Sequence, residues 1–186
     1  MLFRCDDVSL NTDILKLSNM IGIINKKFPQ CNIILGISPL VHEIKEENLL
    51  KERIFPKIFN AFSDFRVFYK TDKCGIPDLE CFSIYNNIAL ASHGLIHVDH
   101  RLLKKEVQEL SIITSSSLVK SSIFIPPFNK WNKDTEEICK ENEIELIKFE
   151  DNWKHILYNK ISEDGKYYFH THDFTLDFFR EKINGL

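Results

Sequence analysis

The stretch Leu2-Phe3-Arg4-Cys5-Asp6-Asp7 is a short apolar run that ends in two adjacent carboxylates. Such a run predicts a first β-strand, and in α/β folds ligand and catalytic groups gather at the carboxyl ends of strands. Side chains alternate along a strand, so Asp6 and Asp7 cannot both point to the same face. One acid can therefore bind a metal while the other handles a proton, provided that histidines converge on the same spot.

Histidines follow two further strand-like runs, at residues 88–91 and 167–169. Five of the seven histidines of the chain lie in the two segments after these runs: His93, His97, His100, His170 and His172. The carboxyl ends of neighbouring parallel strands meet at one edge of a sheet. The two segments are therefore candidates to join the acid pair in one site.

Strand-like and helix-like segments alternate along the chain. Apolar runs predict strands near 3–7, 32–37, 88–91, 121–125, 145–149 and 167–169. Three-and-four spacing predicts helices over 14–28, from Asp99 or His100 through Leu110, over 132–141 and over 176–183, the first capped by Asn11 or Thr12. This alternation predicts an α/β fold, a mainly parallel sheet or barrel with surrounding helices.

The bulk composition bounds the class of protein. The 186 residues, 44% apolar and 27% charged, predict a single globular domain over 1–186. A net charge of −3 gives no nucleic-acid footprint, and no apolar run approaches the ~18 residues of a membrane span. Five scattered cysteines without a CxxC spacing are typical of reduced thiols, and we find no signal-peptide layout. We therefore expect a cytoplasmic protein without a transmembrane segment.

His93 and His97 are four residues apart. On a helical turn this spacing places both imidazoles on one face, as two nitrogen ligands of one divalent ion require. One carboxylate would complete an Asp-His-His set with positions left open for water and substrate, the form of a catalytic metal site. The alternative is a pair of ordinary surface or core histidines.

The order of these motifs resembles that of the polysaccharide deacetylases of the NodB-homology superfamily. Arg4-Cys5-Asp6-Asp7 stands for the family's Thr-Phe-Asp-Asp, His93-Gly94-Leu95-Ile96-His97 for His-Ser/Thr-x-x-His, Ile125-Pro126-Pro127-Phe128-Asn129 for Arg-Pro-Pro-Tyr/Phe-Gly, and 169–173 for the closing Leu-x-His and Asp. The resemblance spans almost the whole chain. It implies a distorted (β/α) barrel and, without an export signal, the branch that acts inside the cell in surface-polysaccharide, lipopolysaccharide or O-antigen biosynthesis.

The resemblance also implies a reaction, the metal-dependent hydrolysis of an N-acetyl group from an amino sugar in a glycan or glycan precursor. The ion would be Zn²⁺ or a similar divalent metal, and the partner an N-acetylated sugar. The implied roles are metal binding by Asp7, His93 and His97, general base for Asp6, oxyanion stabilisation by the N–H of Phe128, and general acid for a late histidine, His172 in preference to His170.

One departure from the family concerns the catalytic base. Ile125 stands where the family usually has an arginine that orients this base. Arg4 is a candidate for that task by position, because it lies two residues before Asp6 and points to the same side of the strand. We also count Arg4 among the candidate substrate-binding residues.

Three further residues complete the expected substrate site. Asn129 and Trp131 can line a sugar site through hydrogen bonds and stacking, or they can form a helix-entry loop with a core tryptophan. Asp151 can orient the late histidine, or it can simply begin a loop. His100 is either a group behind the metal ligands or a surface histidine at a helix start.

Two alternatives to a deacetylase remain open from the sequence. His170-Thr171-His172 mimics the opening His-x-His of metal-dependent phosphoesterases of the histidinol-phosphatase type, although only 14 residues follow it here. A non-catalytic sugar-binding protein of the same fold is the other alternative, and the missing arginine favours it.

Overall fold

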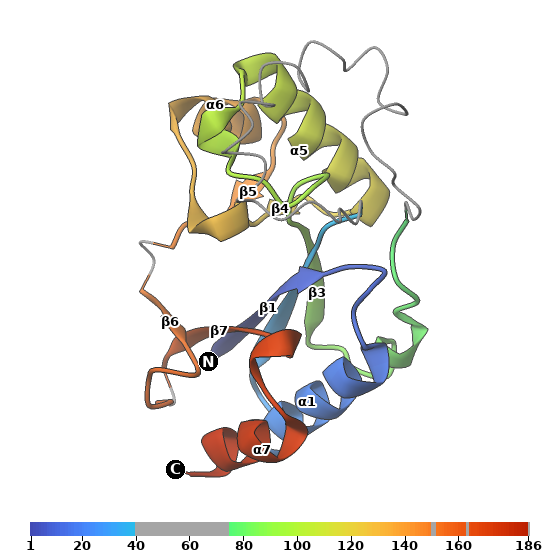
Figure 1. Ribbon diagram of the computed structural model, residues 1–186, viewed down its shortest axis with the longest axis vertical. Helices are drawn as coiled ribbons and strands as arrows, with labels where there is room; N and C mark the ends of the chain where they lie inside the picture. The colour runs from blue at the N-terminus through green and yellow to red at the C-terminus, as the bar shows by residue number, and fades with distance from the viewer. Residues whose placement is uncertain (40–74, 150–151, 163, 186) are drawn as a thin grey trace, which may run out of the picture.

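The computed structural model describes residues 1–39, 75–149, 152–162 and 164–185 (Figure 1). Its strands are β1 Leu2–Val8, β2 Asn32–Ile37, β3 Ile88–Ser92, β4 Ile123–Phe124, β5 Glu145–Leu146, β6 Trp153–His155 and β7 Lys166–His170. Its α-helices are α1 Ile14–Lys27, α5 Lys105–Val119, α6 Lys133–Glu141 and α7 Leu176–Asn184. Short 3₁₀ turns are η2 Glu80–Phe82, η3 His100–Leu102, η4 Pro127–Asn129 and η5 Thr171–Asp173.

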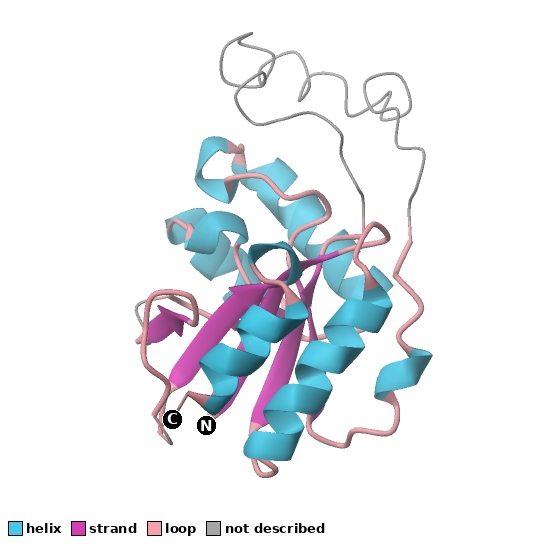
Figure 2. Ribbon diagram, turned by 60° about the horizontal axis from the view of Figure 1, so that its bottom comes forward, coloured by secondary structure: helices cyan, strands magenta, loops and turns pink. Residues whose placement is uncertain are grey.

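The seven strands form one sheet in the order β5-β4-β3-β2-β1-β7-β6, and every described strand pair is parallel. The sheet curls into a half-barrel with helices packed around it (Figure 2). This arrangement confirms the predicted distorted α/β barrel. β1 lies at the centre of the order, between β2 and β7, so its carboxyl end borders two other strand ends.

The alternation of side chains along β1 separates two cores. Phe3 and Cys5 belong to the larger apolar cluster, which α1 and α7 cover on the outside of the sheet (Figure 1). Leu2 packs on the opposite side with a smaller cluster that includes Ile125 and Trp153. Because the strand period is two, Arg4 and Asp6 share the side of Leu2, the inside of the half-barrel.

The amino end of α1 differs from the prediction. Asp13 caps the helix through its side chain, which accepts the N–H of Lys16 at 2.9 Å. The predicted caps, Asn11 and Thr12, lie in the preceding turn, where the hydroxyl of Thr12 accepts the N–H of Ser9 instead. An aspartate one position further along thus satisfies the free N–H of the first helical turn.

The segment after residue 99 also differs from the prediction. The helix expected from Asp99 or His100 is split into η3 and the separate helix α5, and Leu110, expected on its apolar face, is 45% exposed. The face that α5 buries is mostly polar, comprising Gln108, Ser111, Ile112, Ser115, Ser116 and Val119. Gln108 bonds with Thr135 of α6 at 2.6 Å, so hydrogen bonds replace part of the apolar contact there. Among the helices of the described residues, none has the length and apolar character that crossing a bilayer requires.

β6 was not predicted from the sequence, and β5 is shorter than the predicted strand at 145–149. β6 has only three residues, too few to show an alternating pattern, and it forms by pairing with β7. Its first residue, Trp153, is buried inside the half-barrel, and its last, His155, is half-buried at the edge of the site.

Candidate metal centre

The predicted site residues meet at the carboxyl edge of the sheet. Asp6 pairs with His170 in the register between β1 and β7, so the two residues lie side by side. Ser92, the last residue of β3, pairs with Ile37 of the neighbouring β2, and His93 follows directly. Parallel pairing thus brings strand ends that lie far apart in the sequence to one place.

Asp7 is the hub of a histidine cluster. Its Oδ1 lies 3.1 Å from Nε2 of His93 and 3.0 Å from Nε2 of His97, and its Oδ2 lies 3.6 Å from Nε2 of His170. Asp7 adopts a left-handed backbone conformation, φ 62°, and the pairing of β1 with β2 is shifted between Cys5 and Val8. Such a conformation costs about 1–2 kcal/mol for a residue other than glycine. At Asp7, near the carboxyl end of β1, it interrupts the alternation of side chains between the two faces of the sheet.

The two histidines are not on a helix, contrary to the prediction. Residues 93–97 form a loop between β3 and η3. Gly94 makes the loop possible, because its φ is 78° and an added Cβ would lie 2.9 Å from both His100 Cε1 and the carbonyl oxygen of Ile96. The i, i+4 spacing therefore brings the rings together through a tight loop, with their centroids 5.0 Å apart.

His100 supports this loop from behind. It is fully buried, its Nδ1 lies 3.1 Å from the carbonyl of Val98, and its Nε2 lies 3.1 Å from Oγ of Ser111. The same hydroxyl accepts the N–H of Leu95. Burial lowers the pKa of His100 to about 4, so the ring is neutral at neutral pH. His100 is therefore not the surface histidine at a helix start that was one of the two alternatives. Its position agrees with the other alternative, a group behind the metal ligands.

The donor set suits a divalent cation. Nδ1 of His93 lies 2.8 Å from the carbonyl of Ile125 and donates its proton there, so Nε2, which hydrogen-bonds to Asp7 in the absence of an ion, is the nitrogen that an ion could take. One carboxylate oxygen and two imidazole nitrogens within 4.8 Å of one another form a set that zinc and similar ions bind. Asp7 and His97 stay 28% and 32% exposed, so water can reach the group.

The charges of Asp7, His93 and His97 also suit a divalent cation. Burial would raise the pKa of Asp7, but hydrogen bonds from His93 and His97 outweigh it and hold that pKa well below its usual range. Burial would lower the pKa of His93, yet the contact with Asp7 and the charge of Asp6 raise it overall. Asp7 is therefore ionised beside two imidazoles, and a divalent ion at such a donor set would compete with protons for the imidazole nitrogens.

Arg4 and Asp6 form a buried ion pair on the inner side of β1. Nη2 of Arg4 lies 2.8 Å from Oδ2 of Asp6, and the side chains are 0% and 4% exposed. Nη2 also donates to Oδ1 of Asn129, the residue that follows Phe128. Arg4 therefore links the acid of β1 to the loop after β4, from a strand position that the sequence indicated only by alternation.

Two aromatic rings enclose the guanidinium of Arg4. Its Cζ lies 4.7 Å from the ring centroid of Trp153 and 5.2 Å from that of Tyr168, within the range of cation–π attraction. Oδ1 of Asp6 is buried and has no hydrogen-bond partner among the described residues. A buried carboxylate oxygen is costly without a donor. A water molecule at the site would satisfy it, as a proton-accepting carboxylate requires.

The late histidines occupy different environments. Nδ1 of His170 lies 2.8 Å from Oδ2 of Asp173, while its Nε2 faces Asp7. His172 is 67% exposed, and its Nε2 lies 3.7 Å from Oδ1 of Asp173. Burial would raise the pKa of Asp173, but the hydrogen bond from His170 and the nearby histidines lower it overall. The geometry brings His170 into the acid cluster and leaves His172 at its rim.

The residues expected to contact substrate are partly engaged elsewhere. Asn129 binds Arg4, and the indole N–H of Trp131 donates to Oε1 of Glu136 at 3.2 Å. The ring of Phe128 packs on His97 with centroids 4.1 Å apart, and the backbone at Phe128 is left-handed, φ 57°. Asp151 lies outside the described residues.

Trp153 and His155 were not identified from the sequence as residues of this region. Asp173 was likewise not identified as a carboxylate that two histidines share. Asp173 accepts from His170 and also from Nε2 of His155 at 3.0 Å. Asp173 was visible as the last residue of the closing motif, but nothing in the pattern around His155 marked it. Its three-residue strand becomes recognisable only through pairing with β7.

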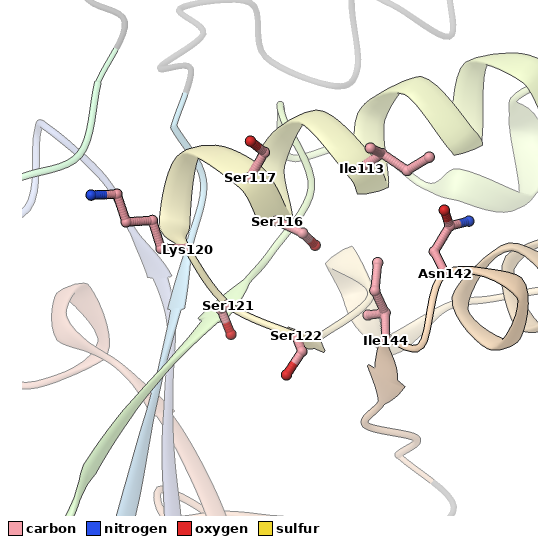
Figure 3. Close-up of a pocket in the computed structure, with 8 residues that line it drawn as sticks. All are labelled: Ile113, Ser116, Ser117, Lys120, Ser121, Ser122, Asn142 and Ile144. Atoms are coloured by element: carbon pink, nitrogen blue, oxygen red, sulfur yellow. The ribbon is translucent and has the colours of Figure 1, made fainter.

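A cavity of about 550 Å³ lies away from this cluster, between the end of α5 and the loop after α6 (Figure 3). Its lining includes Ser116, Ser121 and Lys120. Two of the hydroxyls that line it form hydrogen bonds within the protein: Ser116 bonds with Ser92, and Ser121 donates to the carbonyl of Leu90. It lies at the amino end of β4, whereas the ligand cluster lies at the carboxyl end.

Comparison with known proteins finds no matching family model and no matching curated protein. Solved structures do match. A family 4 carbohydrate esterase from Streptomyces lividans, in complex with acetate, has a TM-score of 0.52 at 9% identity, over 98% of this chain and 86% of that one. A mutant of the peptidoglycan deacetylase PdaC from Bacillus subtilis has a TM-score of 0.54 at 8% identity, over 100% and 82%.

A family 4 pseudoenzyme from Bacillus anthracis has a TM-score of 0.57 at 11% identity, over the whole of this chain. This chain spans 59% of the length of that structure. The chain therefore has the fold of the family 4 carbohydrate esterases and peptidoglycan deacetylases, the NodB type. That fold is found in enzymes and in a pseudoenzyme alike.

Proposed function

We propose that the chain is a metal-dependent carbohydrate N-deacetylase with a single catalytic domain over 1–186. The observation that carries the proposal is the convergence of Oδ1 of Asp7 with Nε2 of His93 and of His97, next to the buried pair of Arg4 and Asp6. The three converging residues would hold a divalent ion, in our proposal Zn²⁺. When bound, such an ion polarises a carbonyl and makes water a stronger acid.

Asp6 is the general base in this proposal. Arg4 fixes Oδ2 of Asp6, which leaves Oδ1 for the proton of the attacking water. Its charge also acts on His93. The peptide N–H of Phe128, whose ring packs on His97, would donate to the oxygen that becomes negative during attack on the amide.

His170 is the general acid that we favour on geometry, and His172 is the alternative. Asp173 holds Nδ1 of His170, so Nε2 is the atom that can deliver a proton toward the cluster around Asp7. His172 is mostly exposed and stacks on His170 with centroids 5.1 Å apart, a position that suits contact with substrate. The departing group is an amine, which must gain a proton to leave.

The substrate in this proposal is an N-acetylated amino sugar in a glycan or glycan precursor. Support comes from the fold shared with a carbohydrate esterase and a peptidoglycan deacetylase. We further propose a role in surface-polysaccharide biosynthesis, including lipopolysaccharide or O-antigen, in the cytoplasm. Arg4, Asn129 and Trp131 act there by shaping the wall of the site, since Nη2 of Arg4 bonds with Oδ1 of Asn129 and the indole N–H of Trp131 bonds with Glu136.

One specific observation favours a second candidate function, sugar binding without turnover. A pseudoenzyme is among the structures with this fold. Metal content together with acetate release separates the two candidates. Bound zinc and measurable sugar affinity without acetate release from any N-acetylated glycan or nucleotide sugar would favour the binding protein.

The test of the proposed function is an acetate-release assay on the zinc-loaded chain, with N-acetylglucosamine oligosaccharides and nucleotide-linked N-acetyl sugars as probes. We expect Asp6→Asn to abolish release while zinc stays bound. We expect His170→Gln to lower release far more than His172→Gln, because His170 is hydrogen-bonded to Asp173 and faces Asp7, whereas His172 is mostly exposed. Near-normal release by Asp6→Asn would contradict the assignment of the base.

A further inference from the structure

A second histidine–carboxylate cluster lies behind the proposed general acid. Oδ2 of Asp173 receives Nδ1 of His170 at 2.8 Å and Nε2 of His155 at 3.0 Å. His155, at the end of β6, is 11% exposed. These three side chains also have the spacing of a metal site, with their ligand atoms within 4.8 Å of one another. The question is whether His155 binds a metal or a proton.

The hydrogen bonds of the ring decide this question. The backbone N–H of Leu157 donates to Nδ1 of His155 at 3.2 Å, so Nδ1 carries no proton. A neutral imidazole then carries its proton on Nε2, the atom that faces Asp173. A protonated nitrogen has no lone pair for a metal. The arrangement is reversed in His93, whose Nδ1 keeps its proton on the carbonyl of Ile125, so that its Nε2, which faces Asp7, can exchange its proton for an ion.

The surroundings of His155 keep the ring neutral and in place. Tyr158, Tyr168 and Phe174 lie against it, with centroid distances of 5.2, 4.7 and 6.4 Å. Burial lowers the pKa of His155 even though the carboxylate of Asp173 acts to raise it. An aromatic enclosure of this kind leaves few rotamers open to the ring.

We propose that His155 is a positioning residue, which donates its Nε2 proton to Asp173 and thereby fixes the carboxylate that orients His170. Asp173 then has two donors on one oxygen and cannot swing away from His170. His170 keeps its proton on Nδ1 and presents Nε2 toward Asp7. The inference rests on the proposed function, since it assigns His170 the delivery of the proton.

The first test is independent of catalysis. Ring ¹⁵N–¹H spectra of the metal-free full chain at pH 8 should show His155 as the Nε2–H tautomer and His170 as the Nδ1–H tautomer. His155→Phe assigns the His155 signals by their loss. A His155 ring protonated on Nδ1 would overturn the proposal.

Zinc titration of the same proteins separates a hydrogen bond from a ligand. We expect His155→Phe to bind as many zinc equivalents as the wild type, whereas His93→Ala loses its site. Loss of a zinc equivalent in His155→Phe would show that His155 is a metal ligand and would overturn the proposal.

The second test concerns the effect on His170. We expect His155→Phe to lower kcat for acetate release from a chitin oligosaccharide by about 10–100-fold, with KM changed little, as for other residues that hold a catalytic group in place. The His170 signals should spread over both tautomers. His155→Gln keeps an N–H that can reach Asp173 and should restore most of kcat and a single His170 tautomer.

Lys154→Gln, an exposed change on the same strand, is the matched control for β6 itself. Wild-type kcat together with an unchanged His170 tautomer in His155→Phe would overturn the positioning role. If the wild type releases no acetate, the proposed function fails, and the tautomer of His170 in His155→Phe and His155→Gln still decides whether His155 fixes it.

Discussion

Arg4 and Asp6, two residues apart on β1, form an ion pair of 2.8 Å with almost no exposure to solvent. Burying either charge alone would be costly, so each residue makes the burial of the other tolerable. Ile125, directly after β4, is apolar and fully buried, and its Cδ1 would lie 3.2 Å from a Cβ added to Gly36. In this chain the cation beside the proposed base therefore comes from the base's own strand.

Removal of the Arg4 guanidinium should destabilise the folded chain. We expect Arg4→Met to lower the free energy of unfolding by about 3–5 kcal/mol, because Asp6 is left as a buried unpaired carboxylate. Urea denaturation measures the change. Adding Asp6→Asn to Arg4→Met should recover part of the loss, whereas the exposed pair Arg180 and Asp177 should tolerate Arg180→Met with little change. A loss of the same size from Arg180→Met would contradict the explanation by burial.

Metal binding should depend on the loop histidines and on Asp7. We expect His93→Ala and His97→Ala each to weaken zinc affinity by at least about 100-fold, since each removes one of three protein ligands. Competition with a chromogenic chelator measures this affinity. His172→Gln serves as the control, because Asp7, His170 and His172 also have ligand spacing. Retention of stoichiometric zinc by a double variant of His93 and His97 would rule out the proposed centre.

The loop that carries the two histidines should not tolerate a side chain at Gly94. Gly94→Ala places a Cβ 2.9 Å from His100 at a φ of 78°, so we expect a loss of more than about 1 kcal/mol in unfolding free energy and weaker zinc binding. Gly22→Ala is the matched control in α1, where an added Cβ meets nothing closer than Tyr85 Oη at 3.7 Å. There we expect stability to be kept or to rise by up to about 1 kcal/mol. Equal effects of the two changes would mean that Gly94 is not needed for its conformation.

The buried His100 should make stability fall in mild acid. Burial lowers its folded-state pKa from the ordinary 6.5 to about 4, so the unfolded chain takes up this proton first. Its stabilising contribution is complete above pH 6.5 and is lost as the pH falls from 6.5 to 4, by up to about 3 kcal/mol. Denaturation of the wild type and of His100→Asn across this range measures it.

The difference between these two proteins isolates His100, because His93, whose pKa is raised, contributes with the opposite sign to both. Asparagine keeps an N–H for the carbonyl of Val98 while losing the titrating ring. Parallel pH profiles for the two proteins would contradict a buried neutral His100.

The sequence by itself determined the α/β class, the strands that precede the candidate functional residues, and the residue types of the candidate centre. Apolar runs and helical spacing are local properties, so they located β1, β2, α1, α6 and α7 well. Asp6, Asp7, His93 and His97 could be selected because acids and histidines placed after apolar runs stand out in a linear pattern. The non-helical loop of His93 and His97 could not be foreseen, since a four-residue spacing fits a tight glycine loop as well as a helix.

Only the tertiary structure decided which groups pair. Strand register set Asp6 beside His170, and the curl of the sheet brought Arg4, Trp153 and Tyr168 together. His155 lies on a strand of three residues that exists only through pairing with β7, so no local pattern could mark it. Hydrogen-bond partners and burial depend on contacts between distant segments, and these contacts distinguish a nitrogen free to bind a metal in His93 from one that carries a proton in His155.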